Sequence, residues 1–436
     1  MTCDHITCGK TPRNFLIATW EGGGSVGPKL TVARKLIDAG HKVRVMSDEC
    51  NRLESEATGA RFVPWTNAPS RPDRRRESDP ILDWAQANPL EGFAQALHDI
   101  FAGRALDYAL DVIDELRREP ADLVISSELL FGVMAACETL DQPLALMPCN
   151  SLMFPLPDAP PAGPVKFDDM TPDQQAEAAA MFAAASAMFD SGLPLLNAAR
   201  AQLALAPLDC LMDQLKPARR ILIGISRHFD FAPEGDHGRF AYVGPQLDDL
   251  AWAGQWYSPW PADDARPLAL VGFSTTFQNH AGVMQRVIDA LSTLPVRALV
   301  TLGPAIEPEE LAPYPNTVLM RSAPHNAVLK EANLVITHGG HGTLARSMTH
   351  GLPVLVIPHG RDQDGNAARI VAHGAGLMLP PSAATHEIHD ALERVLYDRS
   401  IHKRAQRLGA EVEREMRESR VVEELEALCC PEFALS

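Results

Sequence analysis

The chain has 436 residues, of which 46% are hydrophobic, and a formal net charge of -17. This length predicts two domains of roughly 200 residues each, because one hydrophobic core rarely grows so large. The negative charge argues against general nucleic-acid binding, which needs clustered lysine and arginine, and no apolar run approaches the roughly 20 residues of a membrane helix. We therefore expect a cytoplasmic protein without a membrane span or a nucleic-acid partner.

Short apolar runs of strand length recur along the whole chain. Most are continuous rather than alternating, which is typical of parallel strands buried on both faces. Helical patterns with one apolar stripe separate many of them. This alternation predicts two open parallel sheets in an α/β fold. The runs are Phe15–Ala18, Val43–Met46, Leu123–Ile125, Leu144–Met147, Ile221–Ile225, Leu268–Phe273, Ala298–Leu302, Val318–Met320, Leu334–Ile336 and Val354–Ile357.

The segment after Val243 contains three tryptophans between periodic elements and is interpreted as a linker. It divides the chain into an N-terminal domain of residues 1–242, a linker of residues 243–266, a C-terminal domain of residues 267–400 and charged C-terminal helices over residues 401–436. Residues Thr171–Ala206 are rich in alanine, methionine and leucine and should be helical. For this segment we favour plain core packing over a role as a lid or a wall of a binding pocket.

A first glycine loop follows the first predicted strand. Gly22, Gly24 and Gly27 form a G-x-G-x-x-G pattern, and Asp48 stands after the second strand, as in dinucleotide-binding proteins. An NAD-dependent oxidoreductase using Gly22–Gly27 is therefore one hypothesis. Pro28 follows the third glycine and adds nothing to phosphate recognition. The alternative is a tight turn that lines a cleft.

A second and more specific glycine loop follows the run Leu334–Ile336. It reads Thr337-His338-Gly339-Gly340-His341-Gly342-Thr343 and precedes a predicted helix. The free N–H groups of that helix end, the hydroxyl of Thr343 and the imidazole of His338 together predict a cradle for a diphosphate. No lysine follows the glycines, so the segment is not a P-loop.

The next predicted strand is followed by Pro358-His359-Gly360-Arg361-Asp362-Gln363. Because the carboxyl ends of parallel strands share one rim, Asp362 and Gln363 should lie beside the cradle. A carboxylate next to an amide offers hydrogen-bonding groups that suit vicinal sugar hydroxyls. The pair is predicted to hold a sugar, with an ordinary polar turn as the alternative.

The block from Pro324 to Asn366 resembles the donor-binding signature of the family 1 glycosyltransferases, especially bacterial enzymes that decorate natural products such as macrolides. In outline the resemblance covers nearly the whole chain. It implies a GT-B fold, in which two Rossmann-like domains with parallel sheets face an interdomain cleft. The C-terminal domain would hold the nucleotide diphosphate-sugar and the N-terminal domain the acceptor. The C-terminal helices would cross back to the N-terminal domain.

The resemblance also implies roles for individual residues. It places the diphosphate on His338 and the glycine loop, the sugar on Asp362 and Gln363, and the nucleobase near His325. Ser274 and Thr275 match a family loop that touches phosphate. The expected donor-binding residues are Ser274, Thr275, His325, His338, Gly340, His341, Gly342, Thr343, Asp362 and Gln363.

The reaction that this resemblance implies is an inverting, metal-independent transfer of a sugar to a small, natural-product acceptor. The helix end and His338 would stabilise the leaving diphosphate. A UDP- or dTDP-sugar serves as co-substrate, and neither a cofactor nor a metal site is expected. Arg346 stands where many relatives carry a glutamate for the ribose, which leaves the choice between UDP and dTDP open. A homodimer is left open as well.

One part of the family pattern is missing from this chain. Ser25 stands where the family has its catalytic histidine, and Ser127 where it has the supporting aspartate. A serine cannot act as a general base without a group that takes its proton. Glu21 or Glu128 could replace the base, or the acceptor could need little help. As a third alternative, the chain binds donor without transferring sugar, as an inactive homologue or an activating partner.

Overall fold

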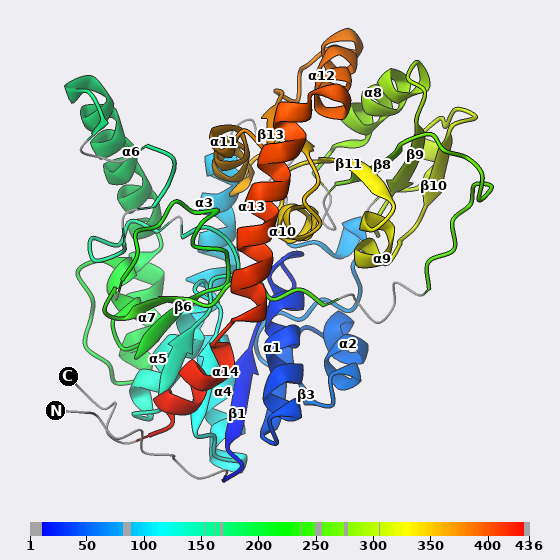
Figure 1. The fold of residues 1–436 in the computed structure, drawn as a ribbon. Coiled ribbons are helices and arrows are strands. Elements are labelled where there is room, and N and C mark those ends of the chain that lie inside the picture. Colours follow the sequence, from blue (N-terminus) through cyan, green and yellow to red (C-terminus); the bar gives the residue numbers. More distant parts are fainter. Residues whose placement is uncertain are drawn as a thin grey trace, which may run out of the picture.

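Two parallel sheets form the framework of the protein in the computed structural model, which describes residues 11–81, 89–152, 154–160, 162–165, 169–235, 237–248, 255–273, 278–304 and 306–430 (Figure 1). The first sheet has seven strands in the order β3-β2-β1-β4-β5-β6-β7, and the second has six in the order β10-β9-β8-β11-β12-β13. The strands are β1 (Asn14–Ala18), β2 (Lys42–Ser47), β3 (Arg61–Pro64), β4 (Leu123–Ser126), β5 (Leu144–Leu146), β6 (Arg220–Ile223), β7 (Phe240–Tyr242), β8 (Leu268–Gly272), β9 (Arg297–Thr301), β10 (Thr317–Met320), β11 (Ala332–Thr337), β12 (Val354–Val356) and β13 (Gly376–Met378).

Each predicted apolar run forms a strand, and the structure adds three that the sequence pattern does not reveal. These are β3, β7 and β13, which lie at edges of the two sheets. They have three or four residues each, and part of each remains accessible to solvent. An edge strand is less fully buried than a central one, so it lacks the continuous apolar run by which the others are recognised.

Helices lie on both faces of each sheet, as the alternation of strand residues shows. Leu16 and Ala18 of β1 join one buried cluster, whereas Phe15 and Ile17 join another on the opposite face. The helices are α1 (Val26–Asp38), α2 (Arg52–Ala57), α3 (Pro89–Ala96), α4 (Ala105–Arg118), α5 (Phe131–Thr139), α6 (Pro172–Asp190), α7 (Leu193–Gln202), α8 (Ala281–Ser292), α9 (His325–Leu329), α10 (His341–Thr349), α11 (Gln363–His373), α12 (Thr385–Tyr397), α13 (Arg399–Arg417) and α14 (Val421–Leu428).

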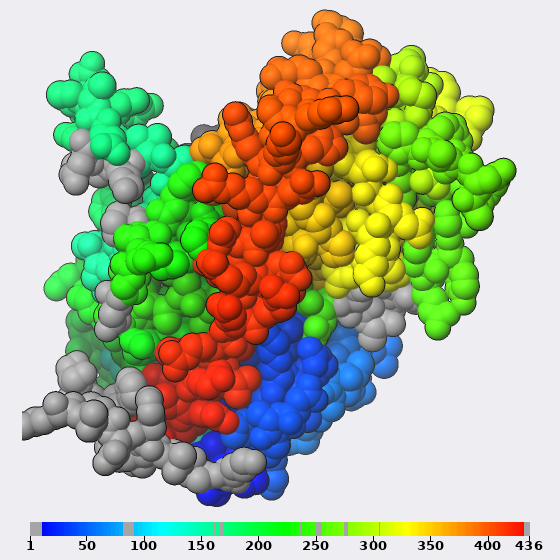
Figure 2. Space-filling view, in the orientation of Figure 1, coloured from blue at the N-terminus to red at the C-terminus, as the bar shows by residue number. Residues whose placement is uncertain are grey.

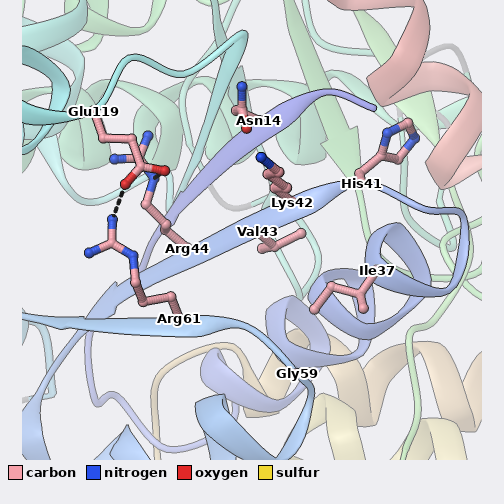
Figure 3. Close-up of a pocket in the computed structure, with 9 residues that line it drawn as sticks. All are labelled: Asn14, Ile37, His41, Lys42, Val43, Arg44, Gly59, Arg61 and Glu119. Atoms are coloured by element: carbon pink, nitrogen blue, oxygen red, sulfur yellow. Dashed lines mark hydrogen bonds and ion pairs between the residues drawn. The ribbon is translucent and has the colours of Figure 1, made fainter. Parts of the chain in front are cut away.

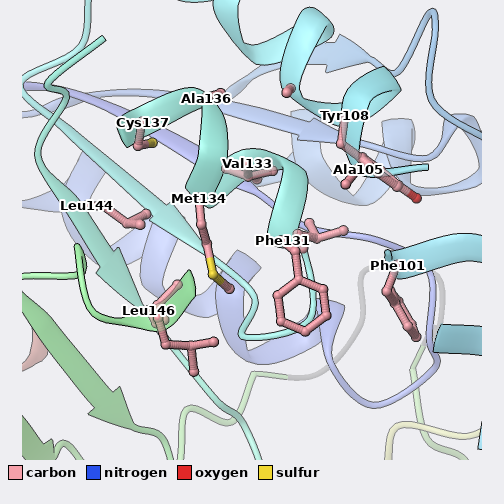
Figure 4. Packing of buried hydrophobic residues seen from close by; sticks show 14 of the residues in the cluster. Phe101, Ala105, Tyr108, Phe131, Val133, Met134, Ala136, Cys137, Leu144 and Leu146 are labelled. Carbon is pink, nitrogen blue, oxygen red and sulfur yellow. The ribbon is translucent and has the colours of Figure 1, made fainter. Parts of the chain in front are cut away.

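The first sheet packs tightly against α4 and α5. Phe131 and Met134 of α5 lie near Leu146 of β5 in this cluster (Figure 4). At Gly132 a β-carbon would stand 2.0 Å from the carbonyl oxygen of Ala105, so only glycine allows the two helices to approach so closely. This packing anchors the carboxyl ends of β4 and β5.

The order of the strands reverses at one point in each sheet. In the first sheet this point lies between β1 and β4, and in the second between β8 and β11. Ligands of open α/β sheets bind outside the carboxyl ends of the strands at such points. The loops after these four strands are therefore where a binding site is expected.

The last two helices connect the cores of the two sheets (Figures 1 and 2). Leu408 and Val412 of α13 belong to a cluster of the second sheet. Leu425 of α14 belongs to the cluster of the first sheet that contains Phe15 and Ile17. The domain boundaries at residues 242, 266 and 400 stay predictions, and residues 249–254 of the proposed linker lie outside the described part.

Core packing, favoured from the sequence for Thr171–Ala206, is wrong for α6. Phe189 is the buried residue of this helix, whereas Met181 is 68% exposed and Phe182 46% exposed. Figure 2 shows the helix projecting from the body of the molecule at the upper left. A capping box between Thr171 and Gln174 and the high helix propensity of alanine support the exposed part of this helix.

By contrast, α7 packs into the core through Leu196, which is fully buried. Among the described residues, no helix on its own is long and apolar enough to cross a bilayer, and α6 with α7 meets that criterion only as a bent pair.

The position of α14 predicts that Leu425→Ala destabilises the first sheet. Leu425 is fully buried, so the substitution should lower the free energy of unfolding by about 2–5 kcal/mol. Glu423→Ala, on the exposed side of the same helix, is the matched control and should change stability little. Urea denaturation followed by circular dichroism measures both. Equal midpoints for the two variants would contradict this assignment of the core.

Candidate active site

The glycine loop after β11 allows a histidine ring to fold over the start of α10. Gly339 has a φ of 97°, and a β-carbon there would stand 2.8 Å from Val356. A β-carbon on Gly340 would stand 2.5 Å from Nε2 of His338. Both positions therefore require glycine. No side chain caps the N-terminus of α10, so this helix end remains available to an anion.

His338 is held at the base of this loop and is 7% exposed. Its Nδ1 lies 3.3 Å from the hydroxyl of Thr337, and the ring donates a hydrogen bond to the carbonyl of Gly272. Burial, reinforced by the neighbouring His280 and His359, keeps the pKa of His338 well below its ordinary value. The imidazole is therefore neutral at physiological pH and carries a single N–H, which in this structure is directed at the carbonyl of Gly272.

An aromatic cluster surrounds His338. The ring of Phe273 lies 5.6 Å from that of His280, 6.2 Å from that of His338 and 5.8 Å from that of His359, between ring centroids. Burial lowers the pKa of His280 to about 3. Positive charge near the cradle therefore comes from the helix end and from Arg361, whose charge also lowers the pKa of His338.

Asp362 stands at the start of α11 beside this cradle. Its Oδ2 accepts a hydrogen bond of 2.8 Å from the amide of Asn366, which also donates to the carbonyl of Gly339 over 3.0 Å. Sequence reasoning included Asn366 only as the end of the motif and gave it no role. Its spacing of four residues after Asp362, one helical turn, is the signal that could have identified it.

Gln363 lies in the same turn but serves the structure of the domain. Its Oε1 accepts a hydrogen bond of 2.7 Å from the backbone of His359, and its Nε2 donates to Gln278 over 3.0 Å. The side chain is 2% exposed. Of the predicted sugar-binding pair, Asp362 is thus the better placed to contact a ligand.

Other predicted donor residues are spread around the cradle. Gly342 and Thr343 lie in the first turn of α10, and His325 lies 3.4 Å from the hydroxyl of Thr301 at the ends of β8 and β9. The ring of His341 donates instead to the carbonyl of Cys149, in the first half of the chain. Ser274 and Thr275 lie outside the described residues.

The first glycine loop is stabilised by an ion-pair network. The Glu21 carboxylate accepts hydrogen bonds from Arg74 over 3.0 Å and from the backbone of Gly23 over 2.8 Å. Asp48 accepts backbone N–H groups of Glu21 and Arg71, each within 2.8 Å. The carboxylate expected to bind a dinucleotide ribose is thereby already bonded, which weakens the NAD hypothesis.

Ser25 is the N-cap residue of α1, and its hydroxyl donates to the carbonyl of Trp20 over 3.3 Å. Glu128 lies two residues after β4, at the point where the strand order of the first sheet reverses. It is 7% exposed and accepts a hydrogen bond of 3.1 Å from Ser127. Burial raises its pKa, and the charge of Asp362 raises it further, whereas Lys29 lowers it.

The two halves of the site face one another through these loops. Ser151, after β5, donates a hydrogen bond of 3.3 Å to Asn366 of α11. Across this contact the charge of Asp362 raises the pKa of Glu128. The candidate base and the predicted sugar-binding residue thus belong to one site.

A separate cavity of about 310 Å³ lies at the other ends of the strands (Figure 3). Asn14 and Lys42, the first residues of β1 and β2, line it together with Arg61, which forms an ion pair of 2.6 Å with Glu119. It contains none of the predicted site residues. Within the described ranges, no group of three or more side chains suited to a metal ion occurs.

Comparisons with known proteins agree with this geometry. Residues 285–428 match the family described as erythromycin biosynthesis protein CIII-like, C-terminal domain. The chain is 26% identical over 434 residues to a 4'-demethylrebeccamycin synthase of Lentzea aerocolonigenes, a match that covers 91% of this chain and 94% of the synthase.

Solved structures share the fold along nearly the whole chain. The glycosyltransferase of kitacinnamycin matches with a TM-score of 0.74 and 19% identity, covering 96% of this chain and 99% of that one. A spinosyn rhamnosyltransferase complexed with thymidine diphosphate matches with a TM-score of 0.66 and 18% identity, covering 95% and 100%. The chain therefore has the GT-B fold of these glycosyltransferases, and its residues 285–428 are similar to the erythromycin biosynthesis protein CIII-like C-terminal domain.

Proposed function

We propose that this protein transfers a sugar from a nucleotide diphosphate-sugar to a small natural-product acceptor, with inversion and without a metal ion. One observation carries the proposal: the uncapped end of α10 and the carboxylate of Asp362 belong to the second sheet, and Ser151 and the buried Glu128 meet them from the first sheet. The names of the relatives support the reaction class, and the thymidine diphosphate of the rhamnosyltransferase supports the donor class.

In this proposal the donor's diphosphate lies on the N-terminus of α10. Backbone N–H groups and the helix dipole stabilise the negative charge that grows on the leaving group. His338 stays neutral over the physiological range because burial lowers its pKa, and its single N–H turns from the carbonyl of Gly272 to the diphosphate when the donor binds. Asp362 then points to the sugar hydroxyls.

Glu128 is the better candidate for the general base. An inverting displacement needs the base on the side of the anomeric carbon opposite to the diphosphate, and Glu128 lies on the opposing sheet near Asp362. Glu21 is instead committed to Arg74 and Gly23. The pKa of Glu128 is raised towards the physiological pH. A general base with a pKa near the working pH accepts a proton from the acceptor more effectively than an ordinary carboxylate does.

His338→Ala should weaken the binding of UDP or dTDP by about 1.5–3 kcal/mol, the usual contribution of a hydrogen bond to a charged group. Isothermal titration calorimetry with both nucleotides measures the loss. His386→Ala, at an exposed position of α12 in the same half of the chain, is the control. Unchanged affinity in His338→Ala would remove this residue from the donor site.

Asp362→Ala should reduce affinity for the complete nucleotide-sugar more than for the bare nucleotide, because its carboxylate is assigned to sugar hydroxyls. Calorimetry with the two ligands in parallel tests the difference. Asp364→Ala, at an exposed position in the first turn of α11, should leave both affinities unchanged. Equal losses for both ligands in Asp362→Ala would show that the carboxylate does not contact the sugar.

Glu128→Gln should lower the single-turnover rate at saturating donor on the order of 100-fold or more, while donor affinity stays near normal. Glu21→Gln is the matched comparison and should retain most of the rate. Rapid-quench measurements in buffer containing EDTA follow both and test metal independence at the same time. Normal turnover by Glu128→Gln would refute its role, and binding without turnover by the unmodified protein would favour the inactive homologue.

A further inference from the structure

The loop between β6 and β7 leaves the first sheet and packs into the second half of the chain. Phe229 of this loop is fully buried in the cluster that contains Leu270 of the second sheet. The backbone N–H of Arg227 donates to the carboxylate of Glu415 on α13 over 2.9 Å. The loop therefore joins the two sheets at a place separate from the contact of Ser151.

Asp230, the residue after Phe229, forms an ion pair with α11. Nε and Nη2 of Arg369 each lie 2.7 Å from Oδ1 of Asp230. The hydroxyl of Tyr242 on β7 donates to the other carboxylate oxygen over 2.6 Å. The side chains of Asp230 and Arg369 are 1% and 13% exposed. Because the pair is buried and the carboxylate accepts a further hydrogen bond, loss of either partner would leave an uncompensated charge.

The same loop is strained next to this ion pair. Phe231 has a φ of 56°, a left-handed conformation that is uncommon for residues other than glycine. Its ring stacks on that of His373, the last residue of α11, with 4.0 Å between the centroids. Nε2 of His373 donates to the carbonyl of Phe229 over 3.2 Å. Such strain persists only where the surrounding contacts determine the conformation, so the loop and α11 are fitted to each other.

Arg369 shares one face of α11 with two residues of the candidate site. Asp362, Asn366 and Arg369 follow one another at intervals of four and three residues, which places them on the same side of a helix. Asn366 contacts Ser151, and Arg369 contacts Asp230. This side of α11 is therefore held against loops of the first sheet at two points along the helix, which fixes its direction as well as its distance.

We propose that Arg369 is a positioning residue, which through Asp230 fixes α11 against the first sheet and so sets where Asp362 holds the donor's sugar relative to the acceptor. Arg369 touches neither substrate. The inference rests on the proposed function, because it assigns a support to the proposed sugar-binding carboxylate. Transfer between two substrates depends strongly on their placement, and a displacement of about 1 Å can cost on the order of 100-fold in rate.

The test separates binding of the donor from the transfer step. Asp230→Asn and Arg369→Gln each break the ion pair and leave the glycine loop and His338 unchanged. The single-turnover rate at saturating donor and acceptor should fall by roughly 10–100-fold, whereas the calorimetric affinity for UDP or dTDP should stay unchanged. Because both substitutions remove one contact, the double variant should be no slower than the slower single variant.

Glu138→Gln is the matched control. Glu138 pairs with the buried Arg200 over 2.6 Å, within the first half of the chain. The substitution neutralises one partner of an ion pair that does not join the sheets, so the rate should stay normal even where the thermal midpoint falls. All rates are measured well below the midpoint of each variant. Should one of the two single variants fail to fold, the other gives the same readout.

Three outcomes would overturn the inference. They are normal single-turnover rates in the folded variants at Asp230 and Arg369, losses that add in the double variant, and an equal loss in Glu138→Gln, which would mark a general effect of stability. Arg369→Lys, which keeps the charge but not the fork of two donors, should recover part of the rate.

The outcome is separable from that of the proposed function. Equal losses of nucleotide and nucleotide-sugar affinity in Asp362→Ala would refute the sugar-binding carboxylate, whatever Arg369 does. A selective loss of nucleotide-sugar affinity in Asp362→Ala, together with normal turnover by Asp230→Asn and Arg369→Gln, would refute only the role of Arg369.

Discussion

The close approach of His338 to the start of α10 is the constraint on which the rest of the site depends. It exists because Gly339 and Gly340 lack β-carbons, which would otherwise collide with Val356 and with the ring of His338. The same loop exposes an uncapped helix end and brings the carbonyl of Gly339 to Asn366. Asn366 in turn positions Asp362, so the diphosphate cradle and the proposed sugar-binding carboxylate are built as one unit.

The second requirement is that two separate sheets present their rims to each other. Their orders reverse between β1 and β4 and between β8 and β11, so the loops that follow these strands can meet. Direct contacts at Ser151 and His341 join these rims, while α13 and α14 connect the cores behind them. In the proposed reaction this arrangement would let each half bind one of the two substrates and orient them together.

The charges in the site follow from burial. Burial lowers the pKa values of His280, His338 and His341, so these rings are neutral at physiological pH. It has the opposite sign for acids and raises the pKa values of Glu128 and Asp362. Against burial, the charge of Lys29 lowers the pKa of Glu128, and the hydrogen bond from Asn366 lowers that of Asp362.

The sequence by itself determined the central strands, the two glycine loops and the donor motif, because continuous apolar runs and glycine spacing are local features. It did not reveal β3, β7 and β13, since short edge strands lack that pattern. It also predicted core packing for α6 wrongly, because an alanine-rich helix has the same sequence pattern whether it is buried or exposed. Only the tertiary structure distinguishes the surroundings of Glu21 from those of Glu128. Glu21 and Glu128 both follow parallel strands at the same rim. Arg74, which is distant in sequence, forms an ion pair with Glu21, whereas the charge of Lys29 lowers the pKa of Glu128. Such pairings arise from packing between separate elements, which no local pattern encodes.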